Sequence, residues 1–297
     1  MAFSFLKRKK FWRWFIGLAL LLPVLVIGIV LLVIYAKQDE VVQQAIAAVN
    51  KQYKGRIEVG DVHLEPFENF PYTSLKVDDV RIYESKDEEA ALGLDVADIY
   101  LGFNLWDILS GNFDVQSLLV EEGFFNIVLH EDGTNNISNA LATNSEGGES
   151  APVDIHLKKI ELRNLDIHKL NEASDTDVET FIYTAVGGFK TEEELLNVHI
   201  DTEFELNVID QGDTTFIKHK HFEFHTDITI DDETGLIAIQ PSGITMEHGD
   251  FELEGSLDIK HDMTVDLAIR GTKPNFDMLI AFAPEDLIPV LERYNNA

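Results

Sequence analysis

The sequence predicts a mainly β protein, in which one N-terminal transmembrane helix precedes an elongated, curved and mostly antiparallel sheet with a few short helices. Three observations lead to this prediction. The chain opens with a basic cluster and a long apolar run, most of the remainder alternates apolar and polar residues, and one strand pattern recurs. Alternation with a period of two is typical of strands with one buried and one wet face, as in antiparallel sheets.

The N-terminus combines a basic tail, residues 1–14, with an apolar segment, residues 15–36. No charge interrupts the run from Phe15 to Tyr35. Because about 20 apolar residues cross a hydrocarbon core about 30 Å thick, we expect a single membrane span. A signal peptide is the alternative, but its apolar region usually has only about 7–15 residues. The basic flank predicts a cytoplasmic N-terminus, so that everything after Ala36 lies outside the cytoplasm.

The composition restricts the partners. The 297 residues include 23 basic and 53 acidic side chains and no cysteine. Without cysteine, disulfides and thiolate chemistry are impossible. The strongly acidic surface repels nucleic acid and anionic headgroups, so we expect no nucleic-acid partner.

The remaining segments follow from local patterns. Residues 37–54 have apolar side chains at helical spacing, which predicts a juxtamembrane helix. Residues 55–141 form a β module with a short helix from Asn104 to Gly111, which has an Asn cap and a Gly stop. A polar linker, residues 142–151, precedes a continuing β region, residues 152–297. That region ends in a helical segment, and one interpretation of this end is that the chain is truncated.

The later strands carry the clearest alternation. Four runs, Val198–Val208, Phe222–Ile230, Phe251–Ile259 and Met263–Ile269, place apolar residues at every second position apart from Thr202, Thr226 and Gly255. Their apolar sides should share one face, which is our candidate lipid-facing surface. Its residues are Val198, Ile200, Phe204, Leu206, Phe222, Phe224, Phe251, Leu253 and Leu257.

Three segments of the sequence share one repeated pattern, which we call the echo. The stretch "VQSLLVEEGFFNIVLHE" resembles "IHLKKIELRNLDIHKLN" 40 residues later, so that Val120 aligns with Ile160. The stretch "LKVDDVRIYES" repeats the same rhythm of strand, polar kink and strand. In the first copy we expect two strand pieces hinged at Gly123. Such repeats favour an elongated, stackable sheet.

The stretch "EDGTNN", Glu131 to Asn136, raises the question of a metal loop. Carboxylate and amide oxygens ligate calcium, but the alternating acids and distal Glu of an EF-hand loop are missing. An Asp-Gly pair after an apolar strand is a common turn signal. We therefore favour a turn over a calcium site.

Three histidines of one strand, His219, His221 and His225, lie on one face together with Glu223. A zinc site is sterically conceivable there, but the face is the wet one and no second cluster is evident to complete the ligands. We favour solvated side chains. Because no nucleophile arrangement or phosphate loop stands out either, we predict no catalytic, cofactor-binding or metal-binding residues and no enzymatic activity.

The order of these features resembles the N-terminal region of the AsmA family, which is related to TamB and to the chorein-type bridge-like lipid transfer proteins. The resemblance rests on "RIEVGDVHLEPF", "YTSLKVDDVRIYE" and "VADIYLGFNLWDILSGNFDVQSLLVEEGFFNIVLHEDGTNN". It covers roughly residues 11–139. A short helix ending in Leu109 and Gly111 leads to a strand pair, which closes on a turn similar to that of the family. The family-like turn residues are Asp132, Gly133, Asn135 and Asn136.

The resemblance implies an inner-membrane-anchored periplasmic protein of cell-envelope biogenesis. Its function would be lipid transport, or the regulation of outer-membrane assembly and of protein targeting to the membrane, through an apolar β-groove. Phospholipid acyl chains and envelope proteins are the partners it implies. The alternative is a membrane-tethered β-scaffold that binds a protein partner and carries no lipid.

Overall fold

The computed structural model divides the chain into two compact units, Met1–Ala47 and Ala48–Ala297. It describes residues 50–51, 53–65, 72–104, 106–107, 114–142, 157–192, 195–215, 217–231, 233–258, 260, 264–272, 280–284 and 287–295. The predicted basic tail, membrane anchor and most of the juxtamembrane helix and the linker lie outside these residues. Among the described residues, none of the helices combines the length and apolarity that a membrane span requires.

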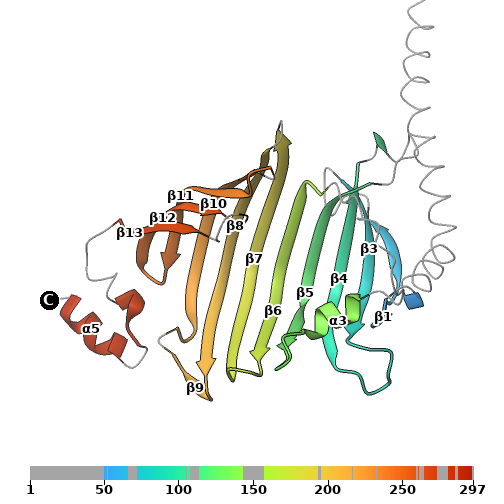
Figure 1. The fold of residues 1–297 in the computed structure, drawn as a ribbon, viewed down its shortest axis with the longest axis horizontal. Helices are drawn as coiled ribbons and strands as arrows, with labels where there is room; N and C mark the ends of the chain where they lie inside the picture. The colour runs from blue at the N-terminus through green and yellow to red at the C-terminus, as the bar shows by residue number, and fades with distance from the viewer. Residues whose placement is uncertain are drawn as a thin grey trace, which may run out of the picture. The chain divides into compact units, whose positions relative to one another are not determined.

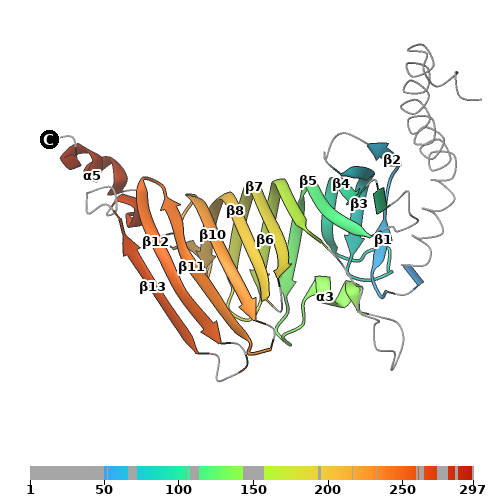
Figure 2. The ribbon, with the colours of Figure 1, turned by 90° about the horizontal axis from the view of Figure 1, so that it is seen from above.

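The second unit is built on one open sheet of 13 strands, which confirms the mainly β prediction. The strand order is β1-β3-β4-β5-β6-β7-β8-β10-β11-β12-β13, with β2 beside β3 and β9 beside β8. Figures 1 and 2 show the strands side by side in a single layer that bends along its length. The strands are β1 (Arg56–Glu58), β2 (Val62–Glu65), β3 (Thr73–Tyr83), β4 (Leu92–Phe103), β5 (Val115–Leu129), β6 (Lys159–Asn171), β7 (Thr176–Glu192), β8 (Leu195–Asp210), β9 (Asp213–Thr214), β10 (Lys220–Asp231), β11 (Leu236–Met246), β12 (Gly249–Asp258) and β13 (Val265–Gly271).

All strand pairs are antiparallel except β5 and β6, which run parallel. Parallel neighbours need a crossover of a dozen or more residues. Here the crossover contains α3 (Asn136–Leu141). The two strands are the echoing segments of the sequence, but they pair with Val120 opposite Leu162, two residues away from the alignment of the echo. A shift of two keeps every side chain on its face, so the apolar faces still coincide.

The expected hinge at Gly123 is wrong. Residues 115–129 form one continuous strand, and its kink is at Glu122, which has a φ of 52°. The polar kinks of the other two copies are likewise left-handed residues, Asp79 with a φ of 49° and Asn164 with a φ of 51°. Gly123 serves a close approach instead, because a Cβ there would lie 2.4 Å from the carbonyl oxygen of Asp95.

The kinks shift the side-chain alternation by one residue. Leu162 and Leu165 are three residues apart, yet Leu165 is buried in the cluster around Val96 and Val120 and the partly buried Leu162 packs against the same cluster. In an unbroken strand they would point to opposite faces. The left-handed residue between them therefore keeps the apolar side chains of both halves on one face of the sheet.

Short helical segments accompany the sheet. The backbone N–H of Trp106 donates to the side-chain oxygen of Asn104 at 2.9 Å, as expected for the Asn cap. Near the C-terminus, residues 280–282 are helical and α5 (Ile288–Asn295) follows. Residues 276–279, 285, 286, 296 and 297 of the predicted C-terminal helix lie outside the described residues.

Candidate functional site

The strand register places the candidate lipid-facing residues on one face. Directly opposed residues of paired strands share a face. Phe204 of β8 is opposite Phe222 of β10, and Phe224 is opposite Ile244 of β11. Ile244 is in turn opposite Phe251 of β12. Leu253 and Leu257 follow at steps of two on β12, as Val198, Ile200 and Leu206 do on β8.

These apolar residues are not deeply buried as a group. Val198 and Phe251 are buried, while the other seven keep part of their surface exposed. The rings of Phe204 and Phe222 stack with their centroids 5.1 Å apart. The face continues onto β13, where Val265, Leu267 and Ile269 are 58%, 48% and 65% exposed. An apolar surface five strands wide is therefore partly open to solvent.

One end of this face packs against the chain itself. Ala281 is fully buried in a cluster with Met246 and Phe251, which Phe222 and Ile244 border. Lys220, only 2% exposed, donates from Nζ to the carbonyl oxygen of Ala283 at 3.0 Å. Residues 280–283 thus cover the Phe222–Phe251 end of the candidate lipid-facing surface.

The "EDGTNN" stretch has the turn that its sequence predicted. Gly133 has a φ of 83°, and the Asp132 carboxylate accepts hydrogen bonds from the backbone N–H and the hydroxyl of Thr134 at 2.9 and 2.7 Å. These bonds lower the pKa of Asp132. Asn135 caps α3 by accepting from the Ser138 N–H at 2.7 Å.

Asn136 fixes this turn to the sheet. Its side chain is buried, and Oδ1 accepts from the backbone N–H groups of Val128 and Ile137 at 2.9 and 3.0 Å. Its Nδ2 donates to the carbonyl oxygen of Asn126 at 2.7 Å. The amide therefore continues the hydrogen bonding of β5 beyond Phe125, where the pairing with β4 ends, while β6 occupies the other edge of the strand. The four turn residues act here as structural groups.

The histidines predicted to be solvated each meet a carboxylate on the polar face of β8 and β10. His219 Nδ1 lies 2.9 Å from Glu205, and His221 Nε2 lies 3.4 Å from Glu203. His225 pairs through Nδ1 with Asp201. The side chains of His219 and His225 are more than half exposed, at 56% and 58%.

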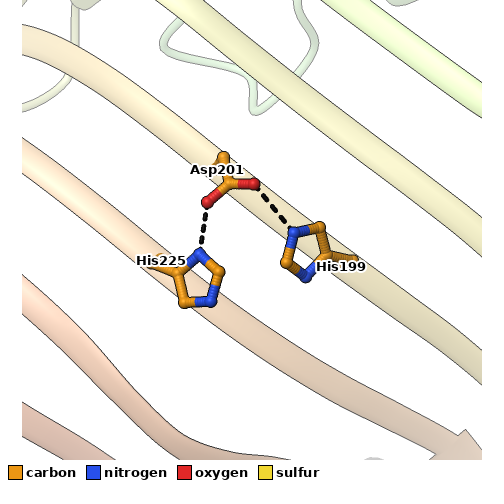
Figure 3. Close-up of side chains that lie close together, drawn as sticks. All are labelled: His199, Asp201 and His225. Carbon is orange, nitrogen blue, oxygen red and sulfur yellow. Dashed lines mark hydrogen bonds and ion pairs between the residues drawn. The ribbon is translucent and has the colours of Figure 1, made fainter.

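His225 also belongs to a cluster that the sequence analysis missed. Asp201 lies between His225 and His199, as Figure 3 shows, and His199 Nε2 lies 2.8 Å from Asp201. The other ring nitrogen, Nδ1, lies 2.7 Å from Asp227. The neighbouring Asp227 and Asp201 carboxylates raise the pKa of His199. The hydrogen bond from His225 lowers the pKa of Asp201, whereas desolvation of the carboxylate acts in the opposite direction and raises it.

A signal for this cluster was present in the sequence. The pattern His-x-Asp occurs twice on successive long strands, as His199-Ile200-Asp201 and His225-Thr226-Asp227. Each pattern places its two side chains on the same face. Only the antiparallel register, which sets His199 opposite Asp227 and Asp201 opposite His225, brings the two patterns together.

The polar face is hollowed around this cluster. A depression of about 340 Å³ is lined by residues of β7, β8, β10 and β11, among them Asp201, Glu203, Glu223 and His225. A second depression, of about 540 Å³, is lined by His199 and Asp227 together with Lys158, Lys190 and Ile228. Both are open, shallow features of the sheet surface.

The chain matches no family model, and no curated protein shows significant similarity to it.

Proposed function

We propose that this protein is a membrane-anchored, AsmA-like protein of the bacterial cell envelope whose apolar sheet face holds lipid acyl chains. In this proposal the N-terminal apolar segment spans the inner membrane and the sheet stands in the periplasm. The protein takes part in lipid transport or in outer-membrane assembly, without enzymatic activity. The observation that carries the proposal is the half-exposed apolar face of β8 to β13.

The size of this face suits an acyl chain. β8 has 16 residues, and at about 3.3 Å per residue it extends roughly 50 Å. Each methylene removed from water contributes about 0.8 kcal/mol, so a 16-carbon chain gains roughly 12 kcal/mol when it is fully covered. Aromatic pairs such as Phe204 and Phe222 supply wide apolar contact without a polar group that would need a partner.

The alternative function is a membrane-tethered scaffold that covers this face with protein. The packing of residues 280–283 against Met246 and Phe251 favours it, because the chain already covers one end of the face in this way. The two functions differ in what lies over the centre of the face, where Phe204, Phe224 and Leu253 remain part-exposed.

In vivo photocrosslinking distinguishes them. A photoreactive amino acid is placed at Phe204, Phe224 or Leu253 in the full chain, with matched controls one residue away on the polar face at Glu205 and Glu223. Lipid handling predicts adducts with phospholipid or another acylated lipid at the apolar positions and none at the controls. Intramolecular or protein adducts alone at all three apolar positions, in membrane-localised protein, would refute the proposal and favour the scaffold.

A further inference from the structure

Four side chains on the polar face form a square between two strands. His199 and Asp201 come from β8, and His225 and Asp227 come from β10. Because His199 is opposite Asp227 and Asp201 is opposite His225, the two imidazoles lie on one diagonal and the two carboxylates on the other. The imidazole centroids are 4.9 Å apart.

Three atoms of this square converge. One ring nitrogen each of His199 and His225 and a carboxylate oxygen of Asp201 lie within 4.8 Å of one another. The nitrogens that contact Asp201 are Nε2 of His199 and Nδ1 of His225. Figure 3 shows both imidazoles directing a nitrogen toward Asp201. In a tetrahedral zinc site with bonds of about 2.0–2.2 Å, ligand atoms are separated by roughly 3.3–3.6 Å. Adjustments on the order of 1 Å in exposed side chains bring these three atoms to that spacing.

Asp227 contacts His199 on the side of the ring that faces away from the three converging atoms. His199 Nδ1 faces its carboxylate at 2.7 Å, while Nε2 faces the convergent point. Histidines that ligate zinc commonly donate their other ring N–H to a carboxylate, which fixes the ring and raises its basicity. This arrangement is independent of the convergence of the three ligand atoms and supports the same chemistry.

The charges on β8 and β10 themselves favour a cation, although Lys158 and Lys190 line the depression beside His199 and Asp227. On β3 to β6 several acids are paired with lysine or arginine, as in the bonds from Lys76 Nζ to Asp98 at 2.9 Å and from Arg163 to Glu121 at 2.6 Å. β8 contains neither lysine nor arginine, and Lys220, the one such residue of β10, donates to Ala283 from the apolar face. Glu203 and Glu223 in the same depression add further negative charge.

A second group with ligand-type side chains, His168, Asp177 and Glu179, is less suitable. It offers a single imidazole, whose Nε2 lies 2.7 Å from Asp177. Its Glu179 accepts a hydrogen bond from Asn207 at 2.7 Å. Imidazole-rich sites suit zinc, whereas one imidazole with carboxylates is less selective for it.

We propose that His199, Asp201 and His225 bind one divalent transition-metal ion of the zinc class, with Asp227 as the outer carboxylate that orients His199. The ion joins β8 to β10, and its remaining coordination positions face the depression, where water or a ligand from a partner completes the shell. The site lies on the polar face, so it does not depend on the proposed lipid function.

The test uses the full chain, purified in detergent without a histidine tag and stripped of metal with a chelator. ZnCl₂ is titrated by calorimetry, and CoCl₂ is titrated by visible absorption, which reports the coordination geometry. We expect one zinc per chain and loss of this stoichiometric binding in His225→Asn and Asp201→Asn. We expect Asp227→Asn to weaken zinc binding about 10–100-fold, the usual effect of removing an outer carboxylate.

Two variants serve as controls. His221→Ser removes a histidine from the same strand face and His168→Asn removes the imidazole of the other group, so both should bind one zinc as the wild type does. Circular dichroism confirms the sheet of each variant. Absence of stoichiometric zinc in the wild type, unchanged binding in His225→Asn, or loss of binding in His168→Asn would overturn the assignment. Unchanged affinity in Asp227→Asn would overturn the role of Asp227.

Discussion

Replacing Asn136 with alanine tests whether one side chain holds the turn after β5 to the sheet. The Asn136 side chain is 1% exposed and makes three hydrogen bonds with backbone groups. Two of these groups belong to β5, the N–H of Val128 and the carbonyl of Asn126. Alanine removes the donor and the acceptor together and provides no substitute.

The magnitude follows from these two β5 groups. A backbone group left without a partner costs about 1–3 kcal/mol when water is excluded. Asn126 and Val128 are only half-buried, so the lower part of that range applies to each, and the total is about 2–4 kcal/mol of unfolding free energy. For a domain of this size the melting temperature then falls by roughly 5–15 °C.

The assay is urea unfolding followed by circular dichroism, together with hydrogen exchange of the Val128 amide. Asn135→Ala is the matched control, because it removes only the α3 cap to Ser138 and should cost about 1 kcal/mol. Asn136→Asp separates the functions of the side chain, since aspartate keeps the acceptor but cannot donate to Asn126. If Asn136→Ala costs no more than Asn135→Ala, and Val128 exchanges as slowly as in the wild type, the argument is refuted.

Three further predictions concern packing, protonation and topology. Gly123→Ala should destabilise the protein by about 3 kcal/mol or more, because its Cβ would lie 2.4 Å from a carbonyl oxygen of β4, whereas Gly243→Ala, with nothing within 4 Å, should change the melting temperature little. The hydrogen-bonded Glu172 carboxylate raises the pKa of His130 above 6.5, so its stabilisation is present below pH 6.5 and is lost as the pH rises through the raised value. Glu172→Gln should lower the His130 pKa in an NMR titration, and an unchanged value would contradict this cause. Ser174→Cys, a unique cysteine in an exposed turn, should react with an impermeant maleimide in cells with an intact inner membrane, and labelling only after lysis would contradict the periplasmic topology.

Local patterns determined several of the strands and their faces. Alternation alone assigned Val198, Phe222 and Leu253 to apolar faces, because side chains of an extended chain must alternate. The same rule placed His225 on the polar face, and the Asp132-Gly133 pair predicted its turn through local hydrogen bonds and a left-handed glycine. These features depend on a few neighbouring residues, so one sequence is sufficient to find them.

The hinge was assigned to the wrong residue for a similar local reason. Glycine is the usual residue at a positive φ, so the hinge was predicted at Gly123. The structure places the left-handed conformation at Glu122 and uses Gly123 to let β4 approach closely. A residue without a side chain suits both a left-handed backbone and a close approach of two strands. Only the position of the neighbouring strand shows which of the two Gly123 serves.

Contacts between distant residues were decided by the tertiary structure. The sequence echo aligned Val120 with Ile160, but the parallel pairing of β5 and β6 sets Val120 opposite Leu162. The two His-x-Asp patterns meet only because of the register between β8 and β10. Residues 280–283 pack over Phe251 only because the chain folds back onto the sheet after β13. The sequence by itself determined the strands with unbroken alternation and the faces of their side chains, because these follow from local geometry. Which strands are neighbours, and at what register, was decided only when the whole sheet brought distant backbone groups together to satisfy their hydrogen bonds.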